Sequence, residues 1–222
     1  MIPTPDLTHI SRRDYDDVYE PAEDTFILLD ALEADLDFLK ALRPLICVEI
    51  GSGSGCVSVF AQKILSGIPT LHICTDINAK ALTVTNSTFQ KNSLSTPNLV
   101  RTSLLNSLRL QSSVDLLLFN PPYVETSTEE YEQATQGHIE ASWAGGANGM
   151  ELTNQLLDSL PSILSPNRGV LYLVAIKQNK PEEIVLRMRN CGFDARIILQ
   201  RRAGREHLHV LRISLSSTEN EI

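Results

Sequence analysis

Four consecutive residues at 120–123, Asn-Pro-Pro-Tyr, could together hold a small flat group that carries an NH2. The carboxamide of Asn120 both donates and accepts hydrogen bonds, and the ring of Tyr123 offers a flat apolar face with a polar tip. Pro121 and Pro122 lack an N–H and fix φ at about −65°, so they would end a strand in a stiff turn with carbonyls free to accept from a ligand. An amide or an adenine amine would suit this site, and a strand-ending turn without chemistry is the plain alternative.

A glycine-rich turn at 51–55, Gly-Ser-Gly-Ser-Gly, follows the apolar run that ends in Glu49-Ile50. Gly51 would permit a tight turn, Gly53 a close approach of the backbone to a ligand, and Gly55 close packing of the next helix on the strand. The spacing differs from the Gly-x-Gly-x-x-Gly of dinucleotide-binding proteins. Asp76, at the end of the next apolar run, is placed to accept hydrogen bonds from two ribose hydroxyls.

These residues need a sheet to bring them together, and the sequence alternates strand and helix patterns. Apolar runs typical of strands lie at 45–50, 71–76, 98–104, 114–119, 169–176, 195–199 and 207–215. Helical spacing of apolar residues lies at 25–42, 56–65, 79–92, 152–164 and 181–190. The alternation predicts a three-layer α/β sandwich, whose mostly parallel sheet ends in an antiparallel hairpin. Ligands bind such sheets at the carboxyl ends of strands, where the glycine turn, Asp76 and residues 120–123 all fall.

The composition is typical of a soluble globular protein, with 42% hydrophobic and 21% charged residues. The net charge of −8 argues against a partner bound mainly through phosphates, so nucleic acid is not expected, and the basic cluster at 200–205 is interpreted as a solvated turn. The four cysteines lack metal-ligand spacing, so we expect buried free thiols and no metal site. Without a signal-peptide pattern or an apolar run near ~20 residues, no membrane association is expected, and the location would be cytoplasmic or nuclear.

Two further stretches narrow the interpretation: Val-Tyr-Glu-Pro-Ala-Glu-Asp-Thr at 18–25 and Ala-Ser-Trp-Ala-Gly-Gly at 141–146. With the glycine turn and residues 120–123, they resemble the HemK-type protein-glutamine methyltransferases, specifically the eukaryotic subgroup that modifies the class I translation release factor. The resemblance covers nearly the whole chain. It implies a class I S-adenosylmethionine-dependent methyltransferase with a seven-stranded sheet in the order 3-2-1-4-5-7-6. It also implies methylation of the side-chain amide of the glutamine in the factor's Gly-Gly-Gln motif.

The resemblance also implies a domain plan and a partner. Residues 1–44 would form an N-terminal segment and helix that pack on the cofactor site, 45–215 the methyltransferase domain, and 216–222 a loose tail. The helical substrate-recognition domain of bacterial relatives is missing before the first strand, so another protein must help to capture the substrate. The subgroup implies a small zinc-binding activator that forms a heterodimer. Its expected docking site is the edge strand 98–104, which has one charge and no proline.

Cofactor contacts carry over from the family position by position. Gly51 and Gly53 would lie against the methionine portion of S-adenosylmethionine, with Glu49 near its amino group. Thr25 would contact the methionine carboxylate or the sulfonium neighbourhood, and Asp76 would hold the ribose.

The chain departs from the family beside the adenine. Ser103 and Leu104 fall where the family has an Asp-Leu pair, so a hydroxyl replaces a carboxylate that would accept from the adenine amine. A serine still accepts one hydrogen bond, so we expect weaker cofactor binding and retained activity.

The residues at 120–123 would act by position. Hydrogen bonds from the substrate NH2 to the Asn120 carboxamide oxygen and the Pro121 carbonyl would aim the nitrogen at the methyl group, in the turn that Pro122 stiffens. Tyr123 would cover the amide and exclude water. Asn120 is therefore expected to be a positioning residue, also next to the cofactor, and not an acid or base.

Other functions stay open on the residues alone. A DNA adenine-N6 methyltransferase shares the tetrapeptide, but it must flip its base and usually needs a basic groove. A protein-lysine methyltransferase needs a deprotonated amine in a narrow apolar channel, on which the sequence is silent. A non-catalytic cofactor-binding scaffold has no need of an intact 120–123 segment.

Several other side chains have plainer interpretations. The long polar stretch at 126–149 predicts a lid or binding loop, and Trp143 is expected to anchor it, with a place at the rim of the substrate site as the alternative. Glu20, Glu23 and Asp24 could favour a positively charged sulfonium near them, but Glu23 and Asp24 are interpreted as first-turn acids that stabilise the following helix. His207 and His209 are expected to share one strand face without binding a metal.

Overall fold

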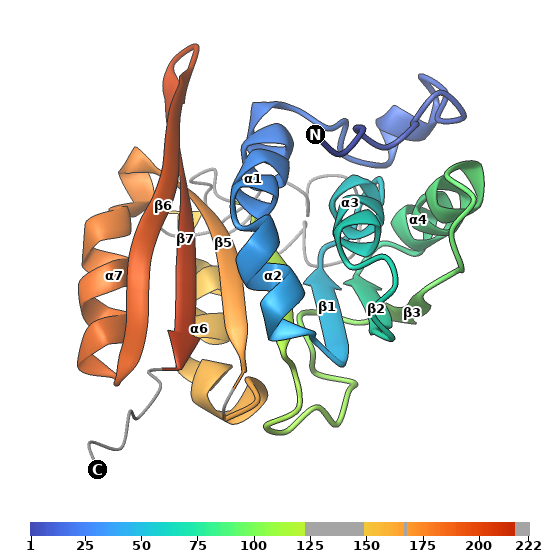
Figure 1. Ribbon diagram of the computed structural model, residues 1–222. Helices are drawn as coiled ribbons and strands as arrows, with labels where there is room; N and C mark the ends of the chain where they lie inside the picture. Colours follow the sequence, from blue (N-terminus) through green and yellow to red (C-terminus); the bar gives the residue numbers. More distant parts are fainter. Residues whose placement is uncertain (123–148, 167, 216–222) are drawn as a thin grey trace.

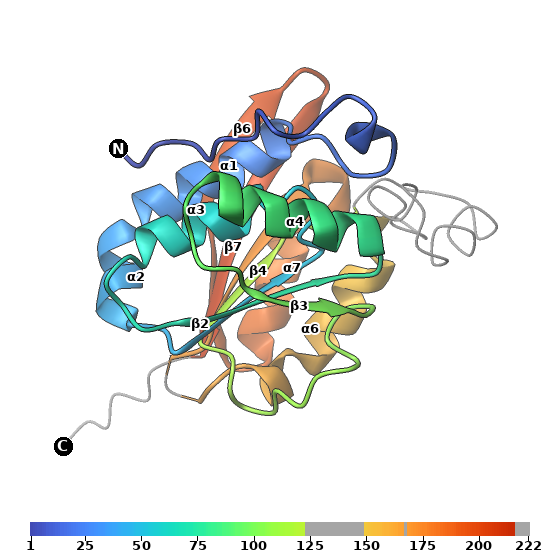
Figure 2. The ribbon, with the colours of Figure 1, turned by 90° about the vertical axis from the view of Figure 1, so that its right-hand side faces the viewer.

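The computed structural model describes residues 1–122, 149–166 and 168–215, which form one seven-stranded sheet between two layers of helices (Figures 1 and 2). The strands are β1 Ile46–Ile50, β2 Leu71–Asp76, β3 Asn98–Arg101, β4 Leu116–Phe119, β5 Val170–Ile176, β6 Phe193–Ala203 and β7 Glu206–Leu215. Their order is β3-β2-β1-β4-β5-β7-β6; β7 runs antiparallel to β5 and to β6, and the other neighbouring strands are parallel. The predicted fold and strand order are confirmed.

Helices cover both faces of the sheet. One face carries α1 Glu23–Ala34, α2 Leu36–Leu42, α3 Cys56–Ile64 and α4 Ala79–Lys91, and the other carries α6 Glu151–Ile163 and α7 Pro181–Asn190 (Figure 1). Each face has its own apolar core. In β4, Leu116 and Leu118 belong to one core and Leu117 and Phe119 to the other. Because successive side chains point to opposite faces, a strand buried on both sides reads as an unbroken apolar run.

The expected helix at 25–42 is two helices, with a break at Asp35. Its carboxylate accepts hydrogen bonds from the Tyr172 hydroxyl at 2.8 Å and the Arg212 guanidinium at 2.7 Å. Both partners lie on the sheet, so contacts with residues far along the chain hold the break, and local periodicity does not reveal it.

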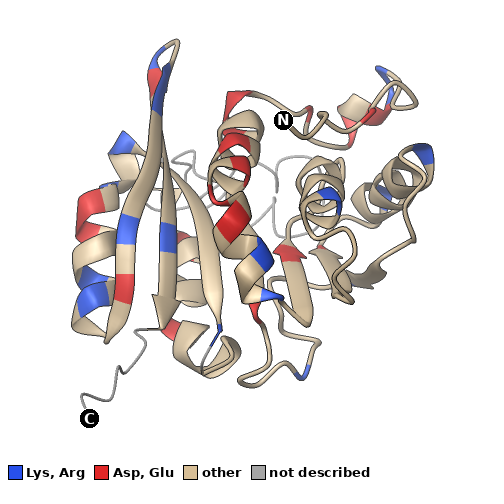
Figure 3. Ribbon diagram, in the orientation of Figure 1, with Lys and Arg blue, Asp and Glu red and all other residues tan. Residues whose placement is uncertain are grey.

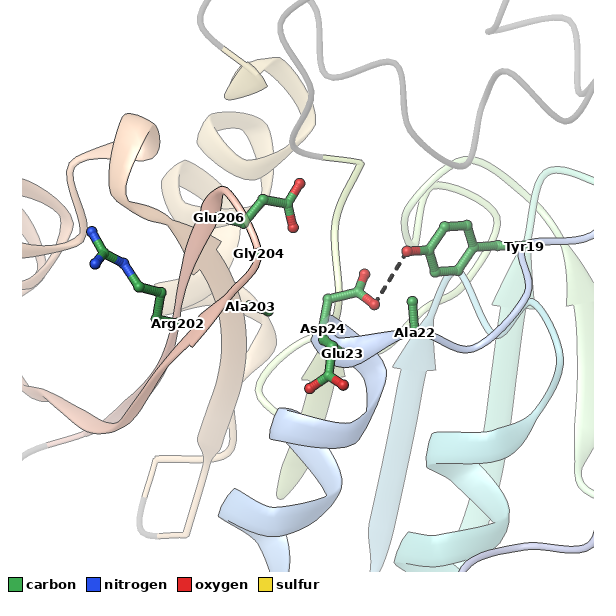
Figure 4. Close-up of a pocket in the computed structure, with 8 residues that line it drawn as sticks. All are labelled: Tyr19, Ala22, Glu23, Asp24, Arg202, Ala203, Gly204 and Glu206. Carbon is green, nitrogen blue, oxygen red and sulfur yellow. Dashed lines mark hydrogen bonds between the residues drawn. The ribbon is translucent and has the colours of Figure 1, made fainter.

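Strand lengths differ from the expectation at both edges of the sheet. β3 stops at Arg101 instead of 104, because the chain turns at Leu104, which has a positive φ of 48°. The β6–β7 hairpin is longer than expected, and its tip at Gly204 extends past the neighbouring strands (Figure 1). Residues near this tip and at the start of α1 line one pocket (Figure 4).

All four cysteines are free, as expected; Cys47, Cys56 and Cys74 are buried. The expectation of burial is wrong for Cys191, which is exposed because it follows the last turn of α7. None of the described helices is long and apolar enough to span a membrane. Within the described ranges, no three His, Cys, Asp or Glu side chains are grouped as a metal would require.

Candidate active site

The strand order brings the three sequence motifs side by side. β1 lies between β2 and β4, and Ile50 is level with Thr75 on one side and Phe119 on the other. The glycine turn, Asp76 and Asn120 therefore follow three adjacent strands at their carboxyl ends. This is the arrangement expected of a ligand site in a parallel sheet.

The glycine turn is open where a ligand would approach. A Cβ on Gly51 would meet no atom within 4 Å, and one on Gly53 would only reach the Gly51 carbonyl at 4.0 Å. A Cβ on Gly55 would lie 2.9 Å from the Thr85 Cα. Gly55 thus permits close packing of the turn on α4, which corrects the expectation that it serves packing of a helix on the preceding strand.

Asp76 holds the glycine turn in place. One carboxylate oxygen accepts from the Gly53 N–H at 3.0 Å, and the other accepts from the Asn78 N–H at 2.9 Å. Burial raises the pKa of Asp76, while these hydrogen bonds oppose the rise. Each oxygen keeps a second lone pair, so the carboxylate can still accept from a ligand.

Glu49 lies in β1, and its side chain is buried directly before the glycine turn. Its carboxyl accepts a hydrogen bond from the Ser58 hydroxyl of α3. Burial raises the pKa of Glu49 to about 8, and the negative charge of Asp76 adds to the rise. A buried carboxyl that titrates near neutrality is typical of a functional site.

Asn120 makes the most informative contact of the site. Its side-chain NH2 donates to the Asp24 carboxylate at 3.0 Å, across 96 positions of sequence. Its carboxamide oxygen is buried and has no hydrogen-bond partner among the described residues. Because an unpaired buried acceptor costs about 1–3 kcal/mol, this oxygen is a candidate contact for a ligand N–H.

Asp24 lies in the first turn of α1, as expected, but its contacts reach beyond the helix. It is 3% exposed, and it also accepts from the Thr25 backbone N–H at 2.7 Å and the Tyr19 hydroxyl at 3.2 Å. It therefore does more than stabilise the start of α1. The sequence pointed to a site role only through its position inside the 18–25 motif and its negative charge.

The remaining expected site residues are distributed around this centre. Thr25 is buried beside Asp24, and Pro121 is buried directly after Asn120. Ser103 and Leu104 are half-buried in the turn after β3, which the Thr102 N–H joins to the Asp76 carbonyl at 3.0 Å. Tyr123, Trp143 and residues 126–148 of the expected lid lie outside the described residues, so their roles remain predictions.

An acidic pocket opens beside Asp24, between the start of α1 and the tip of the β6–β7 hairpin (Figure 4). Its walls are formed by Tyr19, Ala22, Glu23, Asp24, Arg202, Ala203, Gly204 and Glu206. The neighbouring Arg201 forms ion pairs with Glu23 and Asp30 on the acidic side of α1 (Figure 3). At least this part of the basic cluster is therefore neutralised within the protein, which does not favour a phosphate site.

The chain's similarity to known proteins agrees with this geometry. The family model described as the methyltransferase small domain matches residues 25–144, from Thr25 through the Asn-Pro-Pro-Tyr segment. The chain belongs to this methyltransferase family. Its sheet is that of the class I S-adenosylmethionine-dependent methyltransferases, as expected.

Individual relatives match over nearly their whole length. The methyltransferase HEMK2 of Mus musculus is 46% identical over 217 residues, which are 97% of this chain and 98% of the relative. The eRF1 methyltransferase catalytic subunit mtq2 of Schizosaccharomyces pombe is 42% identical over 96% of each chain. The solved E. cuniculi Mtq2–Trm112 complex, described as responsible for the methylation of the eRF1 translation termination factor, contains a chain that matches with a TM-score of 0.67. That chain is 30% identical, and the match covers 90% of this chain and 99% of the solved one.

Proposed function

We propose that this protein transfers a methyl group from S-adenosylmethionine to the side-chain amide nitrogen of a glutamine in the eukaryotic class I translation release factor. The observation that carries the proposal is the buried Asn120 carboxamide oxygen at the end of β4, which has no hydrogen-bond partner in the part of the chain that the structure describes. It offers a single acceptor for an NH2 group beside the glycine turn. The glutamine of a Gly-Gly-Gln motif supplies such a group, and the named function of the S. pombe relative supports this substrate.

The residues of the site fit the cofactor. Open space over Gly51 and Gly53 leaves room for its methionine portion, and Glu49 would take the amino group. Asp76 would accept from the ribose hydroxyls, and Thr25 would contact the carboxylate end. When bound, S-adenosylmethionine supplies a methyl group on a positively charged sulfur, so the difficult chemistry belongs to the cofactor.

The protein's task is then to position a weak nucleophile. The lone pair of an amide nitrogen is delocalised into its carbonyl, which makes the nitrogen unreactive. Hydrogen bonds from the NH2 to the Asn120 carboxamide oxygen and the Pro121 carbonyl would orient the nitrogen and favour loss of planarity. Such orientation can contribute about 7–11 kcal/mol in favourable cases. The methylated nitrogen is strongly acidic, so its proton leaves to water without a dedicated base.

We further propose that a small zinc-binding activator docks on β3. This strand lies at the edge of the sheet, and within the described ranges it pairs with β2 alone. Arg101 is its one charged residue, so it lacks the usual protection against strand addition. The related E. cuniculi chain was solved as a complex with Trm112, which supports a partner of this kind. The free thiols favour a reducing compartment, so we place the heterodimer in the cytoplasm or nucleus.

The test compares substrates under one condition. The chain is purified with a Trm112-type activator and incubated with labelled cofactor and release factor. The parallel reactions contain a release factor whose motif glutamine is alanine, a histone, or single-stranded DNA. We expect label only on the unaltered release factor, with mass spectrometry placing the methyl group on the glutamine amide. Label on the alanine variant would refute the proposal. Label on the histone or the DNA in place of the unaltered release factor would also refute it.

A variant separates catalysis from cofactor binding. Asn120→Ala should abolish methyl transfer and leave the cofactor dissociation constant within about tenfold, because the residue acts on reaction geometry. Loss of cofactor affinity with turnover intact would contradict the role assigned to Asn120.

A further inference from the structure

Several donors from different parts of the described chain converge on the carboxylate of Asp24. Among them are the Asn120 side-chain NH2 at 3.0 Å, the Thr25 backbone N–H at 2.7 Å and the Tyr19 hydroxyl at 3.2 Å. These donors come from the end of β4, from α1 and from the segment before it. Asp24 therefore joins the N-terminal segment to the catalytic turn.

This contact decides which way the Asn120 carboxamide faces. A carboxamide presents a donor on one side and an acceptor on the other, and the two ends have nearly the same shape. A carboxylate only accepts hydrogen bonds, so the NH2 must face Asp24 and the oxygen must face away. That oxygen is the buried acceptor without a partner among the described residues.

We propose that Asp24 is a positioning residue, which fixes the orientation of Asn120 and presents its oxygen to the substrate NH2. In the reverse orientation, Asn120 would direct an NH2 at the substrate NH2, and two donors would face each other. The hydrogen bond to the charged carboxylate also polarises the carboxamide, so its oxygen becomes a better acceptor. This inference rests on the proposed function, because it assigns the Asn120 oxygen to the substrate amide.

Glu23 provides a matched control. It precedes Asp24 in the first turn of α1 and interacts equally with the helix dipole, but its carboxylate is exposed and lies 3.9 Å from Arg201. Glu23→Gln should change kcat by less than about twofold. If Glu23→Gln and Asp24→Asn lower kcat equally, the effect belongs to the helix start and the inference is wrong.

The decisive experiment exchanges the two partners. Asn120→Asp alone opposes two carboxylates and should lower kcat by at least about 100-fold. Adding Asp24→Asn restores one hydrogen bond with its direction reversed, and it leaves a carboxylate oxygen at position 120 for the substrate. The double variant should be at least about tenfold faster than Asn120→Asp. Asp24→Asn alone should lower kcat by about 10-fold or more, with KM for the release factor and cofactor affinity within about threefold.

Several results would overturn the inference. A double variant no faster than Asn120→Asp, or Asp24→Asn with unchanged kcat, would show that the orientation of Asn120 does not depend on Asp24. A separate readout needs no substrate: NMR should show that the Asn120 side-chain NH2 is protected from hydrogen exchange. Exchange at the rate of a free amide would refute the contact itself. A wild-type complex that leaves the release factor unmethylated would instead refute the proposed function, and the NMR result would still decide the contact.

Discussion

Binding of S-adenosylmethionine should release a proton from Glu49, and this is the most quantitative consequence of the structure. Burial raises the pKa of the Glu49 carboxyl to about 8. At pH 6.5 most of the cofactor-free protein therefore carries the proton. If the carboxylate pairs with the cofactor amino group, which is protonated at this pH, close to one proton must leave on binding.

Two calorimetric measurements check this expectation. At pH 6.5, the apparent binding enthalpy should vary with the ionisation enthalpy of the buffer, with a slope that corresponds to nearly one released proton. The dissociation constant should fall about tenfold from pH 5.5 to 6.5, because the free and the cofactor-bound protein differ by one proton. Glu49→Gln, which keeps the size of the side chain, should abolish both effects. Other titrating groups contribute equally to the proton release of the wild type and of Glu49→Gln, so their effect cancels when the two proteins are compared.

The same shift affects the stability of the cofactor-free protein. The folded state holds the proton up to a pH of about 8, whereas an unfolded carboxyl loses it near the ordinary glutamate pKa of 4.5. The free energy of unfolding should therefore fall as the pH rises from about 4.5 to about 8. At a pH of about 8–9, Glu49→Gln should be more stable than the wild type by about 3–5 kcal/mol. Equal proton release by the wild type and the variant, or equal pH dependence of their unfolding, would refute the reasoning.

Substitutions at three further positions test other parts of the protein. Asp76→Ala removes both the ribose acceptor and the support of Gly53, so calorimetry should show cofactor binding weakened about 10- to 150-fold. An unchanged dissociation constant of the cofactor would mean that the ribose is held elsewhere. Ser103→Asp should tighten cofactor binding, and weaker binding would contradict the expected position of the adenine. Val100→Lys or Val100→Pro on β3 should reduce copurification with the activator, whereas Leu186→Lys on α7, an exposed apolar position, should not. A monomer that is fully active and indifferent to both Val100 changes would refute partner docking on this edge.

Local chemistry made most of the fold predictable from the sequence. Alternating strand and helix patterns, the glycines at 51–55 and the prolines after Asn120 all act on neighbouring residues, so their effects are visible in a short window. The same signals placed Glu49, Asp76 and Asn120 at or beside strand ends that a parallel sheet brings to one edge. Element ends were less accurate, as at β3 and the β6–β7 hairpin, because the chain leaves or extends a sheet according to its neighbours.

Long-range contacts decided the rest. The break at Asp35 depends on Tyr172 and Arg212, which lie 137 and 177 positions away and reach it only when β5 and β7 are in place. Glu49 is an ordinary carboxyl in the sequence, and only burial by the folded chain moves its pKa towards neutrality. Asp24 looks like any acid at a helix start until the fold brings it to Asn120. The sequence thus determined which groups could do the chemistry, while tertiary packing determined their protonation and the direction in which they face.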